Sequence, residues 1–324
     1  MSKAFGLVVL VLVAGMVLGL CGCGGMTETG GMVDTAAKPP PPPPPSPNTP
    51  DWIAFQRYVG TSKKAGDQIF IMGSDGSGLR QLTNFDAHGL NITPSWNGSR
   101  TRIVFRSLRT VAGIYSMAQD GTDQQLERPG VYGRFPDWCP AAAKASWVAL
   151  HQDSVPGSPD DGIYVVDTSG GASVGTKVAG TQPEDMFPTW SPDGNLIAFY
   201  SSGRPEPGGL FVIPVMGGTA TYVGVQGAYP DWSPDGTRIA YSRAGNVYYV
   251  TVDPATGVKT GAEQLVTESS VDGYGEHPTW SPDGSYLTCR LGTNVAKVNV
   301  STGAVTPLFA TGDAYSWPDW SLMP

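Results

Sequence analysis

The sequence predicts an all-β fold, a six-bladed β-propeller with four antiparallel strands in each blade. A short motif, P-x-W, recurs at intervals of 40 to 52 residues, which indicates a repeat architecture. Every copy except the last is followed by short runs of β-branched and aromatic residues, separated by glycine and aspartate, a pattern typical of strands and turns. Glycine (43) and proline (29) are abundant, and no stretch resembles a long amphipathic helix.

The repeated motif predicts a structural turn rather than a reactive site used several times. In three copies it continues as W-S-P-D-G. There the proline starts a turn, the aspartate can bond to nearby backbone, and the glycine tolerates a positive φ. The peptide therefore predicts the hairpin between the first and second strands of a blade. The motif tryptophans, expected to pack between blades, are Trp52, Trp96, Trp138, Trp190, Trp232, Trp280 and Trp320.

The later strands of each blade are expected in the apolar runs after this turn. The second strands are predicted at residues 53–55, 103–105, 147–149, 197–199, 239–241 and 286–288. The third strands follow as IFIM, IYSM, IYVV, LFVI, VYYV and VAKVNV, and the fourth are weaker, as in LRQLT from Leu79. The proline before each tryptophan suits the innermost strand, because its edge toward the channel needs no N–H donor.

The two ends of the repeat array predict how the ring closes. The first copy lacks the S-P-D-G turn, because Trp52 leads directly into Ile53, and the last copy has no strands after it. We expect residues 315–320 to supply the first strand of the blade whose other strands lie at 53–83. That strand would pair beside Ile53–Phe55, so that the ring has no open edge.

The repeat W-S-P-D-G…I-A-[FY]…[IL]-[YF]-V resembles the propellers of the TolB family of periplasmic proteins, from Asp51 to Trp320. This resemblance implies the fold without implying one function. TolB proteins carry an α/β domain before the propeller, and here a proline-rich segment occupies that place. Similar repeats occur in prolyl-oligopeptidase-type peptidases, which carry an additional hydrolase domain with a G-x-S-x-G motif.

The N-terminal residues predict an export signal of the bacterial lipoprotein type. Lys3 precedes an apolar stretch of 17 residues, 4–20, and L-C-G-C-G-G follows. The pattern resembles a lipobox with Gly22 as the small residue, so we expect a signal peptide over residues 1–22 and lipidation of Cys23. The alternative is an uncleaved anchor, although 17 residues are at the short end for a membrane span.

Residues 23–50 are expected to form the lipidated cysteine and a tether to the propeller at 51–324. Seven consecutive prolines, at 39–45, favour polyproline II and cannot build a core. An aspartate directly after the lipidated cysteine resembles a signal for retention in the inner membrane. Here Gly24 occupies that position. We therefore expect the protein to face the periplasm or the exterior of a bacterial envelope, with the outer membrane favoured.

Composition and motifs narrow the function classes. The formal net charge is −8 with a pI near 4.8 and no basic cluster, so a nucleic-acid partner is not expected. The three histidines and four cysteines form no motif with metal-ligand spacing, so no metal or other cofactor is expected. Cys139 and Cys289 fall in opposite blades and are expected to be separate buried thiols. We expect the propeller to be a monomer.

One set of residues predicts a binding site. The long connections all lie on one face of the predicted propeller, and the residues before the repeated proline enter the first strands at that face. These positions and their neighbours supply the candidate site residues Arg134, Phe135, Phe187, Tyr229, Glu276, His277 and Trp317. An aromatic funnel with a few charges suits a peptide segment or a sugar. The alternative is that these aromatic residues plug the channel or wedge between blades.

These observations favour a non-catalytic, membrane-anchored propeller that binds an envelope protein or a glycan through this face. The alternative is a metal-dependent carbohydrate-active enzyme, because oligogalacturonate lyases resemble the same repeat family and hold a metal with several channel histidines. Only His277 stands at a suitable position here, so no catalytic residue is assigned. Three or more convergent His, Asp or Glu side chains in the channel would favour an enzyme, and a hydrophobic funnel would favour binding.

Overall fold

The computed structural model describes residues 51–320 apart from gaps at 62–63, 85–88, 130–132, 154–159, 171–174, 206–207 and 311–315. The predicted signal peptide (1–22), Cys23 and the tether (23–50) lie outside the described residues. Where the chain is described, the longest helix, α1 (Ser269–Asp272), has four residues, so none of these helices is long and apolar enough to cross a bilayer.

The described residues form six four-stranded sheets, the blades. The first blade contains β24 (Asp319–Trp320), β1 (Trp52–Thr61), β2 (Lys64–Gly73) and β3 (Arg80–Gln81). The second contains β4 (Asn91–Trp96), β5 (Arg102–Ser107), β6 (Gly113–Ala118) and β7 (Gln125–Pro129). The third contains β8 (Gly133–Trp138), β9 (Trp147–Gln152), β10 (Gly162–Asp167) and β11 (Thr176–Lys177). The fourth blade contains β12 (Asp185–Trp190), β13 (Leu196–Ser201), β14 (Gly209–Pro214) and β15 (Thr221–Gln226). The fifth contains β16 (Ala228–Trp232), β17 (Arg238–Arg243), β18 (Asn246–Val252) and β19 (Lys259–Thr267). The sixth contains β20 (Gly275–Trp280), β21 (Tyr286–Leu291), β22 (Asn294–Asn299) and β23 (Val305–Ala310). Two short 3-10 turns are η1 (Ala142–Lys144) and η2 (Thr168–Gly170).

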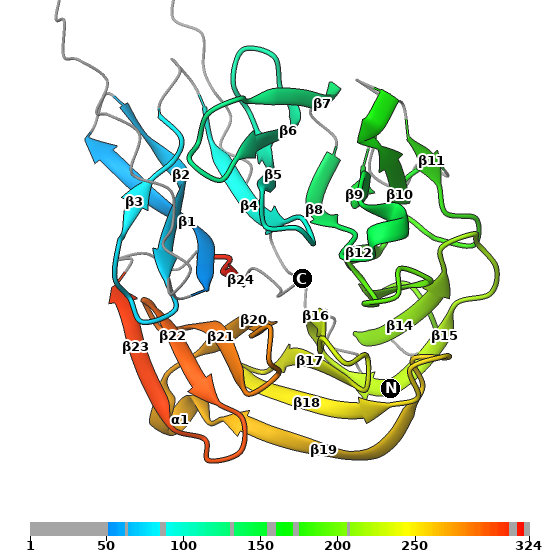
Figure 1. Cartoon of the computed structure of the whole chain (residues 1–324). Helices are drawn as coiled ribbons and strands as arrows, with labels where there is room; N and C mark the ends of the chain where they lie inside the picture. Colours follow the sequence, from blue (N-terminus) through cyan, green and yellow to red (C-terminus); the bar gives the residue numbers. More distant parts are fainter. Residues whose placement is uncertain are drawn as a thin grey trace, which may run out of the picture. The chain divides into compact units, whose positions relative to one another are not determined.

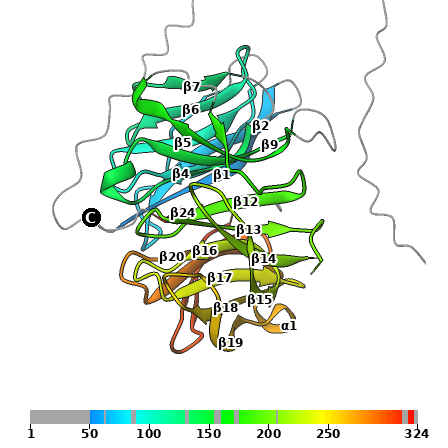
Figure 2. The same cartoon turned by 90° about the vertical axis from the view of Figure 1, so that its right-hand side faces the viewer.

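The blades are arranged in a ring, which confirms the predicted six-bladed propeller (Figure 1). Within a blade the strands follow one another from the channel outward, as β16 to β19 do in both views (Figures 1 and 2). The first strands of adjacent blades contact one another around the channel. Residues at the start of each first strand therefore meet at one mouth of the channel.

The S-P-D-G peptides form the hairpins between first and second strands, as predicted. In the fourth blade the amide of Ser191 donates to the carbonyl of Leu196 at 2.9 Å, and the amide of Gly194 donates to the carbonyl of Ser191 at 2.8 Å. The carboxylate of Asp193 accepts the amide of Asn195 at 3.0 Å, and Gly194 has a φ of 70°. The conserved letters of the repeat thus specify a turn.

The motif tryptophans pack between adjacent blades, as predicted. Trp190 shares a core cluster with Ile163 and Val178 of the third blade. Trp232 packs in the same way against Val223 of the fourth blade. Because each blade inserts its tryptophan against its neighbour, the buried apolar residues form separate clusters between adjacent blades.

The C-terminal strand closes the ring, as predicted. β24 pairs with β1, with Trp320 opposite Ile53 and Asp319 opposite Ala54. The pairing is shorter than the predicted segment 315–320, of which residue 315 is not described. Trp320 packs with Val295 of the sixth blade, so the same short strand also fills the interface between the last and first blades.

Each of the other five first strands contains a bulge at its repeated proline. In β12, Met186 pairs with Tyr200 and Thr189 with Ala198, so three steps along β12 match two along β13. The same shift occurs in β4, β8, β16 and β20. The residues immediately before the prolines adopt φ values between 51° and 57° and are Thr93, Phe135, Phe187, Tyr229 and His277.

The two described cysteines are separate and buried, as predicted. Cys139 and Cys289 are both free thiols. Burial raises the pKa of Cys139 to about 11 and that of Cys289 to about 12, so both stay protonated and unreactive near neutral pH.

Candidate functional site

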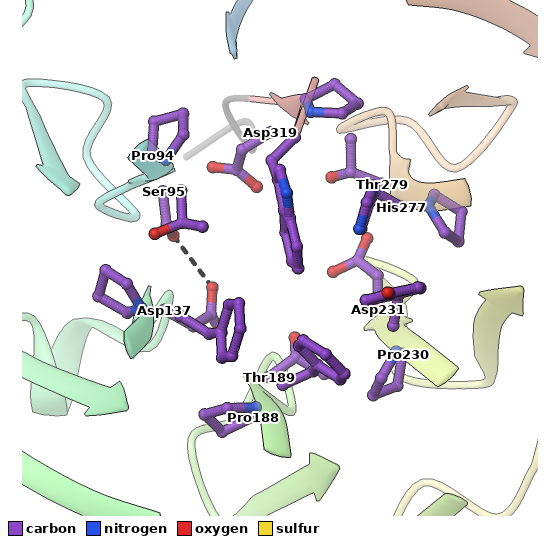
Figure 3. Close-up of a pocket in the computed structure, with 18 residues that line it drawn as sticks. Pro94, Ser95, Asp137, Pro188, Thr189, Pro230, Asp231, His277, Thr279 and Asp319 are labelled. Carbon is purple, nitrogen blue, oxygen red and sulfur yellow. Dashed lines mark hydrogen bonds between the residues drawn. The ribbon is translucent and has the colours of Figure 1, made fainter. Parts of the chain in front are cut away.

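The bulges direct their side chains toward the channel and nearly close one of its mouths. A cavity of about 100 Å³ remains, lined by the repeated proline and its two neighbours from all six blades (Figure 3). An aromatic or β-branched residue with positive φ costs about 1–2 kcal/mol. Five such residues around one cavity mean that backbone strain is concentrated at this mouth.

Four ring side chains pack in a row around the mouth, and we call them the aromatic arc: Phe135, Phe187, Tyr229 and His277. Neighbouring ring centroids are 4.4, 4.5 and 4.1 Å apart in that order. Trp317 lies within the arc, with its centroid 3.7 Å from His277, 5.1 Å from Phe135, 5.3 Å from Tyr229 and 5.7 Å from Phe187. The structure thus brings together five of the predicted site residues.

Polar atoms at the mouth keep unused hydrogen-bonding capacity. His277 is only 6% exposed, and burial, followed by the charge of Arg290, holds its pKa well below the usual value, so the ring is neutral. The backbone of Ser316 approaches this ring, yet neither ring nitrogen makes a well-aligned hydrogen bond to any described residue. The buried hydroxyl of Thr93 also lacks a partner in the described part of the chain. A neutral imidazole carries one donor and one acceptor, so a ligand could satisfy both.

The two charged residues predicted for the site lie beside the mouth. Arg134 pairs with Asp153 at 2.8 Å, and Glu276 pairs with Arg290 at 2.5 Å. Neither Arg134 nor Glu276 is among the residues that line the cavity. Burial, and then the charge of Glu276, raises the pKa of Tyr229 to about 12. The aromatic arc is therefore uncharged, and the charges near it are paired.

Below the arc, a belt of hydrogen bonds joins the first strands of neighbouring blades, and sequence reasoning missed it. The residue between proline and tryptophan alternates between aspartate and a hydroxyl residue around the ring (Figure 3). In ring order from the first blade, these belt residues are Asp319, Ser95, Asp137, Thr189, Asp231 and Thr279. The alternation is visible in the sequence, at the residue between proline and tryptophan of P-x-W. Only the closed ring, however, brings these residues from distant copies into contact.

The belt residues accept backbone amides that the bulged strands leave without a ladder partner. Each carboxylate accepts the amide of the next blade's tryptophan: Asp319 from Trp96 at 2.6 Å, Asp137 from Trp190 at 2.9 Å and Asp231 from Trp280 at 2.7 Å. The hydroxyl of Ser95 accepts the amide of Trp138 at 3.2 Å and donates to Asp137 at 3.0 Å. The belt therefore links neighbouring blades around the channel.

Burial dominates the electrostatics of the belt. The three carboxylates lie deep in the protein, although the channel leaves part of each accessible. Burial raises the pKa of Asp137 to about 6 and that of Asp231 to about 7. The pKa of Asp319 is raised well above its usual value by burial and by the charge of Asp137. Among the described residues, no group of three or more His, Cys, Asp or Glu side chains is placed to hold a metal ion.

Four of the seven exposed large apolar side chains among the described residues lie at or near the connections beside this mouth. In an antiparallel blade, the connections between second and third strands and between blades lie on the face where first strands begin. Val111, Val271 and Tyr274 belong to these connections, and Tyr58 lies near the end of β1 that leads to one of them; each of the four is at least half exposed. Large apolar side chains on one face of a soluble domain mark candidate interaction surfaces.

Comparisons with known proteins agree with this architecture. A family profile described as the TolB beta propeller domain matches residues 133–323. Among solved structures, TolB from Acinetobacter baumannii is similar, with a TM-score of 0.66 and 17% identity over 84% of this chain and 67% of that chain. A putative TolB from Agrobacterium tumefaciens has a TM-score of 0.57 and 16% identity over 83% of this chain and 98% of that chain. An oligogalacturonate lyase in complex with manganese has a TM-score of 0.50 and 13% identity over 74% and 70% of the two chains.

At these identities the likeness to solved structures shows the fold alone. No curated protein sequence matches the chain.

Proposed function

Because the chain belongs to the TolB β-propeller domain family, we propose that it is a non-catalytic binding propeller that recognises a protein or a glycan of the bacterial envelope. The face that carries the aromatic mouth is the recognition surface. The observation that carries this proposal is the concentration of strained ring residues from four blades beside unpaired, buried polar atoms. Strain of this kind persists where the surrounding structure enforces it, and it clusters at binding sites.

The location follows from the N-terminal sequence. We propose that the protein is held outside the cytoplasmic membrane by a lipid on Cys23, with residues 24–50 as a spacer, and that the outer membrane is its site. Cys23→Ala is expected to leave the precursor uncleaved or to release the protein from the membrane fraction. Mass spectrometry of the mature protein is the direct test, and a free, unmodified Cys23 would contradict the proposal.

Crosslinking in intact envelopes, followed by capture of the propeller, tests the binding function. With the captured partner in hand, Tyr229→Ala is expected to weaken binding by about 1–3 kcal/mol, the usual scale for an aromatic anchor. Tyr249→Ala is the matched control, because the ring of Tyr249 packs against Trp280 in an interblade core. Equal losses of binding in both variants would mean that the effect is structural and that the mouth is not the site.

A second candidate is a metal-dependent carbohydrate-active enzyme. Its basis is that three belt carboxylates line one cavity, although no group of acidic or histidine side chains among the described residues is placed to hold a metal ion. Their carboxylate oxygens already accept backbone amides, and Asp137 and Asp231 alternate with hydroxyl residues. Release of unsaturated products from oligogalacturonate in the presence of Mn²⁺, lost in Asp231→Asn, would support this candidate. If the assay yields no unsaturated product and crosslinking captures a partner, the binding function is supported.

A further inference from the structure

Trp317 differs from the other five residues at its position. The five equivalent residues have positive φ and sit in bulged strands, and Trp317 is not among them. β24 begins only at Asp319, whereas the other first strands include the equivalent residue. The chain therefore leaves the sheet at Trp317 and carries this side chain into the aromatic arc.

We propose that Trp317 is an internal ligand: the mouth is a pocket for a planar aromatic group, the chain's own indole occupies it, and a partner enters by displacing that indole. The inference rests on the proposed binding function and specifies the chemistry of the group that enters the site. It also makes Trp317 an inhibitory plug rather than a contact residue for the partner.

Geometry supports a replaceable plug. Trp317 stacks at 22° against Phe135 and meets Tyr229 edge-on at 88°, the two arrangements that aromatic pairs favour. Trp317, Phe135 and Tyr229 are each partly exposed, so the plug can be reached from solvent. The remaining cavity of about 100 Å³ is smaller than the roughly 150 Å³ that suffices for benzene, so an aromatic ligand has no room until Trp317 leaves.

The charge at the mouth favours a neutral group. His277 is neutral, Tyr229 stays protonated, and the positive charge of Arg290 lies close enough to His277 to lower its pKa. Arg290 is already paired with Glu276, so it offers no unpaired charge to an incoming ion of either sign. The ring nitrogens of His277, neither of which has a well-aligned partner among the described residues, can pair with the N–H and C=O groups of a peptide that carries the aromatic side chain.

Indole binding to Trp317→Ala, measured by isothermal titration calorimetry, tests the plug directly. The variant is expected to bind indole at least about tenfold more tightly than the wild-type protein. Each ring of the arc that contacts the indole adds to the binding free energy, and about 1.4 kcal/mol corresponds to a tenfold change in Kd. Tetramethylammonium and a neutral monosaccharide serve as probes of the same size class. Preference for either of these over indole would overturn the assignment of a planar aromatic group.

Two further variants keep the test decisive. Trp317→Ala with Phe187→Ala removes one wall of the arc and is expected to lose the gained indole affinity. Undiminished binding in this double variant would place the indole elsewhere and overturn the proposal. If Trp317→Ala does not fold, Trp317→Leu with phenol as the probe replaces it. If neither Trp317→Ala nor Trp317→Leu folds, the proposal is also overturned. A side chain that a partner displaces cannot be required for the fold of the ring.

The outcomes separate this inference from the proposed function. Trp317→Ala is expected to bind the captured envelope partner more tightly than wild type, whereas Tyr229→Ala binds it more weakly. If indole fails to bind Trp317→Ala but Tyr229→Ala still weakens the partner, only the plug is wrong. If indole binds and Tyr229→Ala leaves the partner unaffected, the pocket exists and the proposed recognition surface is wrong.

Discussion

At the scale of single residues, the belt carboxylates accept hydrogen bonds that join neighbouring blades. Their burial at the same time disfavours the charged form. Asp231 accepts the amide of Trp280, which favours its charged form, yet desolvation outweighs this bond and its pKa rises to about 7. Between the ordinary value of 3.8 and this raised value, the folded protein binds more protons than the unfolded chain. The contribution of Asp231 to stability therefore falls as pH rises from about 4 to about 7 and is level above that.

Asp231→Asn is expected to stabilise the protein at pH 8, because it removes a buried charge while its carbonyl still accepts the amide of Trp280. The hydroxyls of Thr189 and Thr279 can turn to accept from the new amide group. Thermal unfolding should show a higher Tm than wild type, by about 2–4 °C for each kcal/mol in a domain of this size. The difference should shrink as pH falls and vanish near pH 4.

Asp75→Asn is the control of opposite sign. Hydrogen bonds from Ser77 lower the pKa of the exposed Asp75 side chain, so its contribution to stability is present near neutral pH and lost in acid. The variant is expected to be slightly less stable than wild type at pH 7 and equal to it at low pH. A rise in Tm for both variants at pH 8 would mean that net charge, and not burial, causes the effect.

At the scale of elements, the hairpin between first and second strands depends on its glycine. Gly236 in the fifth blade has a φ of 71°, and a Cβ there would meet nothing closer than 3.7 Å. Gly194 in the fourth blade has nearly the same φ, but its Cβ would lie 2.9 Å from the sulfur of Cys139. The same turn therefore has room for a Cβ in the fifth blade, whereas in the fourth blade it is packed closely against the third blade.

Gly236→Ala is expected to cost about 1–2 kcal/mol of unfolding free energy, the price of a left-handed conformation for a residue with a Cβ. Gly194→Ala is expected to cost more, because the neighbouring blade must also shift. Urea unfolding of both variants measures the two free energies. Equal losses would show that the contact with Cys139 adds nothing and that the turn conformation alone sets the cost.

At the scale of the whole molecule, a short strand holds the ring together. β24 contributes two residue pairs to the first blade, a buried tryptophan to the interface with the sixth blade, and a carboxylate to the belt. These three contributions come from Asp319 and Trp320. Without them the core shared by the first and sixth blades would lose a buried tryptophan, and β1 would present an open edge.

Deletion of residues 313–324 is expected to open the ring and remove most of its stability. Trp320→Ala, which keeps the strand but empties the interface, is expected to cost about 3–5 kcal/mol, as large core truncations do. Thermal unfolding followed by near-UV circular dichroism compares the two. An unchanged Tm in the truncated protein would contradict closure by β24.

Local sequence patterns sufficed to predict the blades. The turn in W-S-P-D-G, the short β-branched strands after it and the unmatched last copy at Trp320 each depend on residues close together in the chain, whose preferences do not need the ring. The repeat also placed Phe135 and its equivalents at one mouth, because equivalent positions in a symmetric array must lie on one circle.

Only the tertiary structure decided how those residues interact. The bulges and the positive φ of the ring residues arise where a first strand pairs with its second strand beside a proline, and no propensity of Phe187 or Tyr229 predicts them. The belt depends on bonds such as that between Trp96 and Asp319, which lie at opposite ends of the repeat array. The seat of Trp317 within the arc likewise depends on four other blades, because contacts between distant segments exist only once the ring has closed.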